Sequence, residues 1–325
     1  MLTEPGAELL SALKRAFPSW ECVCSDGGME LRSPRSGQYR PPRRTPSWQQ
    51  LLTTMESSCK EHGVARGDVL PLRGLSDADL TFSAVQALDP YLKRRHLHTY
   101  SSGFIPQPVV RLTGRRADDG TLQSGFLTSF VNVSIVQPIK TVDEHVALVD
   151  SWIAVLSAIG LHARYLTIAG TLRTWTRREV GGITLRLVHG EMILGDAVLL
   201  WNTADPAFLA SDIGSGLERI RWAVIRDEWT EVVYGRPLCA TATAGTLDAL
   251  RTATLIVGSG IAPAHRGPGS VARRLLRASA TAVGTLGLSR VVRWAHDYWS
   301  LVCPLRLPWS EVCRIIETET YRRPL

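Results

Sequence analysis

The chain has 325 residues, of which 45% are hydrophobic and 21% charged, a balance typical of globular proteins with a sizeable buried core. This length favours two domains. The apolar runs are shorter than a membrane-spanning helix and the first residues do not resemble a signal peptide, so we expect a cytoplasmic protein with no membrane partner. The net charge of +7 makes an acidic partner such as RNA a candidate.

Residues 1–46 differ in composition from the rest of the chain. A short amphipathic piece is followed by a run rich in proline and arginine, from Arg32 to Pro46. Proline and like charge disfavour packing in this run, so we expect an N-terminal extension with a basic linker, outside the core. Apolar residues at helical spacing then predict a helix over 48–62.

A strand–loop–strand pattern follows, with an arginine on one arm and an aromatic residue on the other. The first strand is predicted over 107–111 and ends on Arg111, and the second, over 126–136, carries Phe130. An arginine in this position can neutralise a phosphate, and an aromatic ring can stack on a base. Arginine beside a strand is also common in proteins that bind no nucleotide.

The middle of the chain alternates strands with a few helices. An amphipathic helix is predicted over 142–159. Short strands are predicted at 163–168, 183–188, 191–194 and 197–201. Because most of these strands follow one another without a helix between them, the pattern predicts an α+β fold with an antiparallel sheet. From residue 247 onward the pattern is helical, over 247–257, 270–283, 288–299 and 309–320.

The stretch 211–223 reads as a strand, a glycine turn and a helix. Its two glycines, Gly214 and Gly216, allow a backbone to approach a ligand closely. Arg219 falls in the first helical turn, where backbone amides already favour anions. Such an element can hold an ammonium group on Asp212 and a phosphate or flat ring on Arg219. The alternative is an ordinary glycine loop with an exposed aspartate and a solvated arginine.

The C-terminal part is strongly basic, with no acidic residue between Asp248 and Asp297. We predict RNA-binding residues here, namely Arg266, Arg273, Arg274 and Arg277. The last three share one face of a helix, and no acidic residue of the same stretch is available to pair with them. A codon bias toward arginine and alanine is the alternative explanation.

Two stretches resemble the catalytic half of alanyl-tRNA synthetase, a class II aminoacyl-tRNA synthetase. Residues 212–220, Asp-Ile-Gly-Ser-Gly-Leu-Glu-Arg-Ile, are similar to that family's Asp-Thr-Gly-Met-Gly-Leu-Glu-Arg-Ile, its version of motif 3. Residues 248–277 are similar to a second signature, through Asp-Ala-Leu-Arg at 248–251 and Arg-Gly-Pro-Gly-Ser-Val at 266–271.

The resemblance implies a fold and three regions. A class II synthetase-like antiparallel sheet flanked by helices would occupy 47–240. A helical domain, a truncated form of the family's tRNA-recognition region, would occupy 241–325. Residues 1–46 have no counterpart in the family.

The resemblance also implies an ATP site. Arg111 would bridge the ATP α-phosphate and the amino-acid carboxylate, and Arg219 would lie near the γ-phosphate, so these two are the expected catalytic residues. Phe130 and Arg219 would sandwich the adenine, and Gly214 and Gly216 would line the ATP site. Adenylation at this site would use ATP and Mg²⁺, and we expect no structural metal.

The implied amino-acid site uses three further side chains. Asp212 would hold the α-ammonium group, Asn202 would contact the amino acid, and Trp175 would form a wall of the side-chain pocket.

Departures from the family narrow the expected function. The second strand of the hairpin lacks the family's Thr-Ala-Arg-His-His loop, for which Arg115 or Arg116 could supply the missing charge. The chain also stops where the family continues into further tRNA-recognition helices and an editing domain. We therefore expect a stand-alone aminoacyl ligase or transferase that acts on a small-molecule acceptor. Its donor would be an amino acid activated by ATP, or an aminoacyl-tRNA. The alternative is a non-catalytic paralogue that binds tRNA or a partner protein and regulates it.

Overall fold

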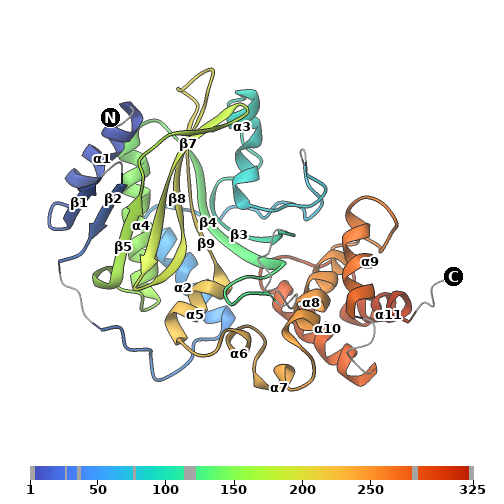
Figure 1. Cartoon of the computed structure of the whole chain (residues 1–325). Coiled ribbons are helices and arrows are strands. Elements are labelled where there is room, and N and C mark those ends of the chain that lie inside the picture. The colour runs from blue at the N-terminus through green and yellow to red at the C-terminus, as the bar shows by residue number, and fades with distance from the viewer. Residues whose placement is uncertain are drawn as a thin grey trace. The chain divides into compact units, whose positions relative to one another are not determined.

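The computed structural model describes residues 4–25, 28–34, 38–75, 78–112, 122–279 and 285–321. Within these ranges the fold is α+β, with a large antiparallel sheet flanked by helices and a C-terminal helical region (Figure 1). The predicted fold class is therefore confirmed at this level. None of the helices in the described ranges combines the length and the apolar content needed to cross a membrane.

The sheet contains nine strands in the described part of the chain, in the order β1-β2-β5-β7-β8-β9-β4-β3, with β6 paired to β7 beside this path. The strands are β1 (Glu21–Ser25), β2 (Gly28–Arg32), β3 (Gly103–Val110), β4 (Ser129–Ile139), β5 (Leu166–Gly170), β6 (Trp175–Arg177), β7 (Val180–His189), β8 (Met192–Asn202) and β9 (Leu209–Gly216). Neighbours in the chain are often neighbours in the sheet, as the sequence pattern predicts.

The chain divides into two compact units. The first, here called the sheet unit, holds residues 1–70, 84–106 and 132–226. The second, here called the helical unit, holds residues 71–83, 107–131 and 227–325. This division differs from the predicted boundaries at 46/47 and 240/241, because two short segments from the first half of the chain belong to the helical unit.

Helices cover one face of the sheet in the sheet unit. The central one is α4 (Val142–Ala158), which contacts β8, β9, α1 (Glu4–Ala16) and α2 (Trp48–Glu61) (Figure 1). Capping side chains fix the first residues of α4 and α2. The Thr141 hydroxyl accepts from the backbone N–H of Glu144 at 3.2 Å, and Ser47 and Gln50 form a reciprocal capping box before α2.

We expected residues 1–46 to lie outside the core, and this prediction is wrong for most of the segment. Leu9 of α1 and Leu31 of β2 are buried, and β2 pairs antiparallel with β5. Arg15 forms an ion pair with Asp143 at the start of α4, at 2.7 Å. The amphipathic spacing of the first helix buries an apolar stripe, and the proline-rich run that follows does not prevent this packing.

The remaining elements of the sheet unit are short. They are η1 (Ala84–Leu88), α3 (Asp89–Arg94), η2 (Ala163–Tyr165) and α5 (Leu217–Ile225), the last of which directly follows β9. The elements η1 and α3 pack on the face of the sheet opposite to α4, where Ala84, Leu88 and Leu92 share an apolar cluster with Val136 of β4 and Leu200 of β8.

The helical unit is built around α8. Its helices are α6 (Trp229–Tyr234), α7 (Arg236–Cys239), α8 (Ala244–Gly258), α9 (Pro268–Ser279), α10 (Thr285–Ser300) and α11 (Trp309–Thr320). Contacts of α8 with α9, α10 and α11 help to bury it from Thr246 to Gly258. The predicted helices at 247–257, 288–299 and 309–320 are confirmed, and the predicted helix at 270–283 continues past α9 into positions outside the described residues.

The stretch 248–277, which resembles the second synthetase signature, supplies buried side chains that bind another segment of this unit. Asp248 and Thr252, on α8, are both buried. The Asp248 carboxylate accepts from the backbone N–H of Thr128 at 2.9 Å, and the hydroxyls of Thr252 and Ser129 lie 2.8 Å apart. These contacts fix the residues that lead into β4 against α8.

Candidate functional site

The strand β9 and the helix α5 form the element predicted over 211–223. Side chains alternate along a strand, and Ser211 and Ser215 are buried on the α4 side, where Ser211 meets His145 at 2.8 Å. Asp212, Gly214 and Gly216 therefore face the opposite side of the sheet. The helix starts directly after Gly216, so the strand, glycines and helix occur as the sequence predicts.

Strand register gives Asp212 and Gly214 their neighbours. Val136 of β4 and Val198 of β8 lie directly opposite Asp212, one on each side. Residues paired in this way present their side chains on the same face. The carboxylate of Asp212 therefore stands between two apolar side chains on the face away from α4.

Gly214 is required by close packing. Asp196 of β8 and Ser134 of β4 lie opposite it. A Cβ at this position would collide with the Ser134 side chain and would lie only 3.0 Å from the carbonyl oxygen of Val133. The glycine thus has a structural cause in the strand pairing, in addition to its predicted place in an ATP site.

Arg219 lies in the first turn of α5 and is half-buried. Its Nη1 donates to the carbonyl oxygen of Ile193 at 3.3 Å. Burial lowers the pKa of the guanidinium, and the negative charge of Asp196 acts in the opposite direction. Arg219 keeps its charge at neutral pH, because the guanidinium is by far the most basic side-chain group. The element therefore brings a cation near the face that carries Asp196 and Asp212.

Trp175 of β6 lies on the same face of the sheet. It is opposite Gly182 of β7, and a Cβ on that glycine would lie 2.5 Å from the indole ring. The indole Nε1 donates to the Thr184 hydroxyl at 3.0 Å. Trp175 and Val198 both pack against the apolar cluster under η1 and α3. These contacts hold Trp175 on this face of the sheet, and its role as a wall of an amino-acid pocket stays a prediction.

Asn202 has a different set of contacts. It is buried at the end of β8, and its amide nitrogen donates to the carbonyl oxygen of Leu92 at 2.7 Å. Its amide oxygen accepts from the backbone N–H groups of Ala204 and Asp205, both at 3.0 Å. These bonds hold the β8–β9 turn to α3. A contact of Asn202 with an amino acid stays a prediction.

Arg111 and Phe130 belong to the helical unit, where the structure brings them together. The guanidinium carbon of Arg111 lies 5.1 Å from the centre of the Phe130 ring, in the range of a cation–π contact. Nε of Arg111 donates to the carbonyl oxygen of Phe82 at 2.6 Å. The two arms thus bring the arginine and the aromatic ring together, and their roles at an ATP stay predictions. Arg115 and Arg116 lie outside the described residues.

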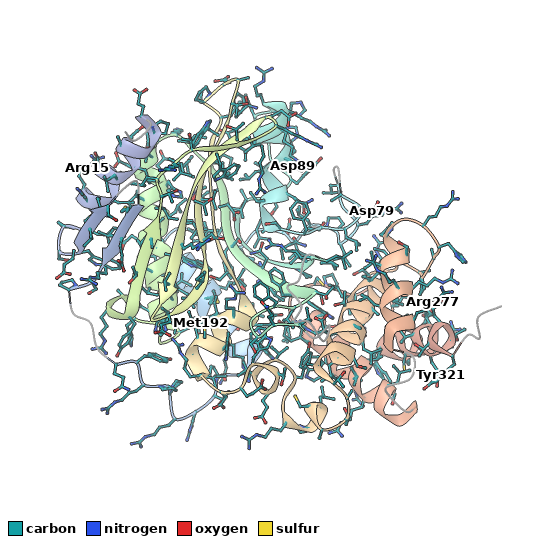
Figure 2. All side chains as sticks on the ribbon, viewed as in Figure 1. Arg15, Asp79, Asp89, Met192, Arg277 and Tyr321 are labelled. Atoms are coloured by element: carbon teal, nitrogen blue, oxygen red, sulfur yellow. The ribbon has the colours of Figure 1, made fainter. Side chains whose placement is uncertain are left out.

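The predicted RNA-binding arginines divide into two groups. Arg266, Arg274 and Arg277 are exposed, and Figure 2 labels Arg277 near the end of α9. Arg273 instead forms an ion pair with Glu319 of α11 at 2.9 Å, and the two side chains are only 14% and 9% exposed. No acidic residue lies within the basic stretch itself, but Glu319, from beyond that stretch, pairs with Arg273.

Sequence reasoning missed Asp196, Thr184 and Ser134, which share a face with Asp212. Their residue types carry no motif, and only the strand register reveals that they lie together. A simple alternation count along β8 would place Asp196 and Val198 on one face, but not opposite Gly214 and Asp212.

We name this arrangement the sheet-face site: Trp175, Thr184, Asp196, Asp212 and Arg219, with Val136 and Val198 as its floor. Two carboxylates and an apolar floor suit a small molecule that carries an ammonium group and a short apolar part. In the helical unit, the cation and ring of Arg111 and Phe130 suit a phosphate and a flat heterocycle. Within the described ranges, no three His, Cys, Asp or Glu side chains gather in a way that could hold a metal ion.

No protein-family model matches the chain, and no curated protein matches its sequence.

Proposed function

We propose that the chain is a stand-alone aminoacyl ligase or aminoacyltransferase, which attaches an amino acid to a small-molecule acceptor such as an amine, a sulfonamide or a nucleoside. The observation that carries the proposal is the sheet-face site. There Asp212 lies between two valines, with Arg219 one helical turn beyond the same strand and Trp175 as a wall. The likeness of residues 212–220 to the alanyl-tRNA synthetase motif also supports it.

In this proposal each residue has a simple electrostatic or positioning role. Asp212 holds the α-ammonium of the amino acid through a charge-assisted hydrogen bond, and Trp175 limits the size of the amino-acid side chain. Arg111 and Arg219 neutralise phosphate oxygens, and Phe130 stacks on the adenine. No covalent nucleophile is needed, because adenylation at phosphorus depends on positioning and charge neutralisation.

ATP and Mg²⁺ are the cofactors in the adenylating form of this proposal. The metal would bind mainly through the phosphate oxygens of ATP, as Mg²⁺ usually does. The second form takes an aminoacyl-tRNA as donor and needs no ATP. The exposed arginines at 266, 274 and 277 favour this second form.

A non-catalytic paralogue that binds tRNA or a partner protein is the second candidate function. The observation that favours it is the internal use of Asn202, Asp248 and Thr252, whose side chains hold the fold together. Residues similar to a synthetase signature can thus persist for structural reasons alone.

Pyrophosphate exchange tests the proposal. The full chain is incubated with ATP, Mg²⁺, labelled pyrophosphate and each amino acid in turn, and hydroxylamine traps any acyl adenylate as a hydroxamate. A parallel assay supplies aminoacyl-tRNA and hydroxylamine without ATP. Asp212→Asn should raise the KM for the amino acid roughly tenfold, because a charge-assisted bond becomes a neutral one. Asp150→Asn, on the exposed face of α4, is the matched control. If neither assay gives a product, the enzymatic proposal fails and the non-catalytic candidate remains.

A further inference from the structure

The segment 38–47, here called the strap, runs without helix or strand structure between β2 and α2. Both of its ends are fastened to α5, the helix that carries Arg219. The middle of the strap is rich in arginine and proline, in the order Arg-Pro-Pro-Arg-Arg at 40–44. The strap thus presents a basic segment in a fixed position.

The first anchor is Tyr39. Its hydroxyl donates to the carbonyl oxygen of Val224 at 2.8 Å, which satisfies one of the open carbonyls at the end of α5. Its ring meets His189 edge-on with centres 4.7 Å apart, and meets Tyr165 in the same way at 5.4 Å. The guanidinium of Arg226 lies 5.6 Å from the Tyr39 ring.

Arg226 completes this anchor. It has a left-handed backbone with φ of 65° after α5, and its Nε donates to the carbonyl oxygen of Ala223 at 3.1 Å. Its Nη2 donates to Nδ1 of His189 at 2.5 Å. Since arginine can only donate, His189 must be the neutral tautomer that accepts at Nδ1. The Tyr39 ring therefore packs against a hydrogen-bonded pair, Arg226 and His189.

The second anchor is at Pro46. Nε of Arg221, on α5, donates to its carbonyl oxygen at 3.3 Å. The same guanidinium lies 4.2 Å from the centre of the Trp48 ring, a close cation–π contact. Both ends of the strap are thus held by backbone and side-chain groups of one helix and its C-terminal cap.

Three arginines stand between the anchors. Arg40, Arg43 and Arg44 are all exposed, and the chain has no acidic residue between Glu30 and Glu56. In the part of the chain that the structure describes, none of the three forms an ion pair. Pro41 and Pro42 fix the backbone between the first and the second arginine. Like charges so close together repel each other, and a bound anion relieves this repulsion.

We propose that the strap is an RNA-binding element, whose three arginines contact successive phosphates of an RNA backbone. A run of arginines along an anchored segment suits a chain of phosphates better than a single small anion. A membrane surface is disfavoured, since the aromatic side chains of the strap region, Tyr39 and Trp48, are half-buried in contacts with α5. This inference rests on the proposed function in its tRNA-donor form. The arginines at 266, 274 and 277 are the first predicted RNA contact, and the strap, on the sheet unit, is the second.

The test measures the binding of a fluorescently labelled tRNA transcript to the full chain at several salt concentrations. Replacing Arg40, Arg43 and Arg44 together by Gln should lower the magnitude of the log–log salt slope by about 2, since each phosphate contact contributes roughly 0.7 to 0.9. Affinity at low salt should fall at least about tenfold. The control replaces three other exposed arginines of the sheet unit, Arg94, Arg95 and Arg173, by Gln.

A second variant tests the anchoring. Tyr39→Ala removes no charge but frees one end of the strap, so it should also weaken tRNA binding, because the arginines lose their fixed arrangement. Thermal unfolding verifies that the variants remain folded. An unchanged slope in the strap variant, or an equal loss in the control, overturns the inference.

The assay needs neither ATP nor an acceptor. A chain that binds tRNA through the strap but makes no product refutes the proposed function alone. A chain that makes product from free amino acid and ignores the strap substitutions refutes this inference alone.

Discussion

Nη1 of Arg251, on α8, donates to the carbonyl oxygen of Ser129 at 2.6 Å, and the arginine is fully buried. Its guanidinium lies 4.6 Å from the ring centre of Tyr298 and 4.5 Å from that of Trp299. The basic composition of this region predicts that its arginines face RNA. Arg251 instead ties three segments of the helical unit together.

Arg251→Ala should destabilise the protein by about 3 kcal/mol or more, because it removes a charged hydrogen bond and two cation–π contacts and leaves a cavity. Arg251→Lys keeps the charge but cannot stack in the same way, so it should recover only part of this loss. Denaturation in urea, followed by tryptophan fluorescence, measures both. If the alanine variant unfolds at the wild-type midpoint, the buried arginine does not stabilise the unit.

Arg273 and Arg277 should behave differently although they share one helix face. Arg273→Gln leaves the carboxylate of Glu319 without its ion-pair partner and should cost about 2 kcal/mol of stability. Arg277→Gln removes an exposed charge and should change stability by less than about 0.5 kcal/mol. Thermal unfolding of the two variants makes the comparison. Equal effects would show that the ion pair contributes nothing.

Two buried histidines predict a loss of stability in acid. Burial lowers the pKa of His145 to about 3, and burial together with the charge of Arg226 lowers that of His189 to about 4. Below a pH of about 6.5 the unfolded chain binds protons that the folded chain cannot, so stability is full above this pH and falls as the pH drops toward 4.

The variant that isolates this effect is His145→Gln. It should reduce the pH dependence of the unfolding free energy by up to about 1.4 kcal/mol per pH unit between pH 4.5 and 6. Urea denaturation at a series of pH values gives the slope. His162→Gln, at an exposed histidine, is the control, and a slope that stays the same in the His145 variant would contradict the assignment.

Gly214 offers a test of close packing between β4 and β9. Gly214→Ala should destabilise the protein by about 1–3 kcal/mol, because the new methyl group collides with the Ser134 side chain. Adding Ser134→Gly should restore part of the loss, although the carbonyl oxygen of Val133 stays close. Unfolding midpoints of the single and double variants show whether the two positions are coupled. Simple additivity of the two substitutions would exclude the predicted collision.

Arg219 gives a prediction that depends on the proposed function. If the adenylating form is right, millimolar ATP with Mg²⁺ should raise the thermal midpoint of the wild-type chain, since ligand binding to the folded state stabilises it. Arg219→Ala should abolish this shift, whereas Arg173→Ala, at an exposed position, should retain it. A wild-type chain that ATP does not stabilise would favour aminoacyl-tRNA as the donor.

Periodicity predicted the local elements of this fold well. The helix after Thr141 and the strand–glycine–helix element at 211–223 follow from apolar spacing and glycine positions, and both occur. The strand–loop–strand pattern also places Arg111 and Phe130 on adjacent arms, and the structure brings the two side chains together. These features depend on residues close together in the chain.

Features that depend on distant residues could not be predicted. The partner of Arg273 is Glu319, and the neighbour of Gly214 is Asp196 only because of strand register. The N-terminal segment was misjudged for a similar reason. Its proline content disfavours regular structure locally, but Leu9 and Leu31 are buried by elements from later in the chain.

The path of the chain between the two units has a consequence for how the protein is made. The chain passes between the units at 70/71, 83/84, 106/107, 131/132 and 226/227. The helical unit therefore cannot form from segments 71–83 and 107–131 until residues 227–325 have been made. During synthesis the two early segments leave the ribosome well before these partners. Contacts between segments that lie so far apart in the sequence slow folding. No single cut can separate the units, so a truncation at 226 should yield a chain that aggregates rather than a smaller stable protein.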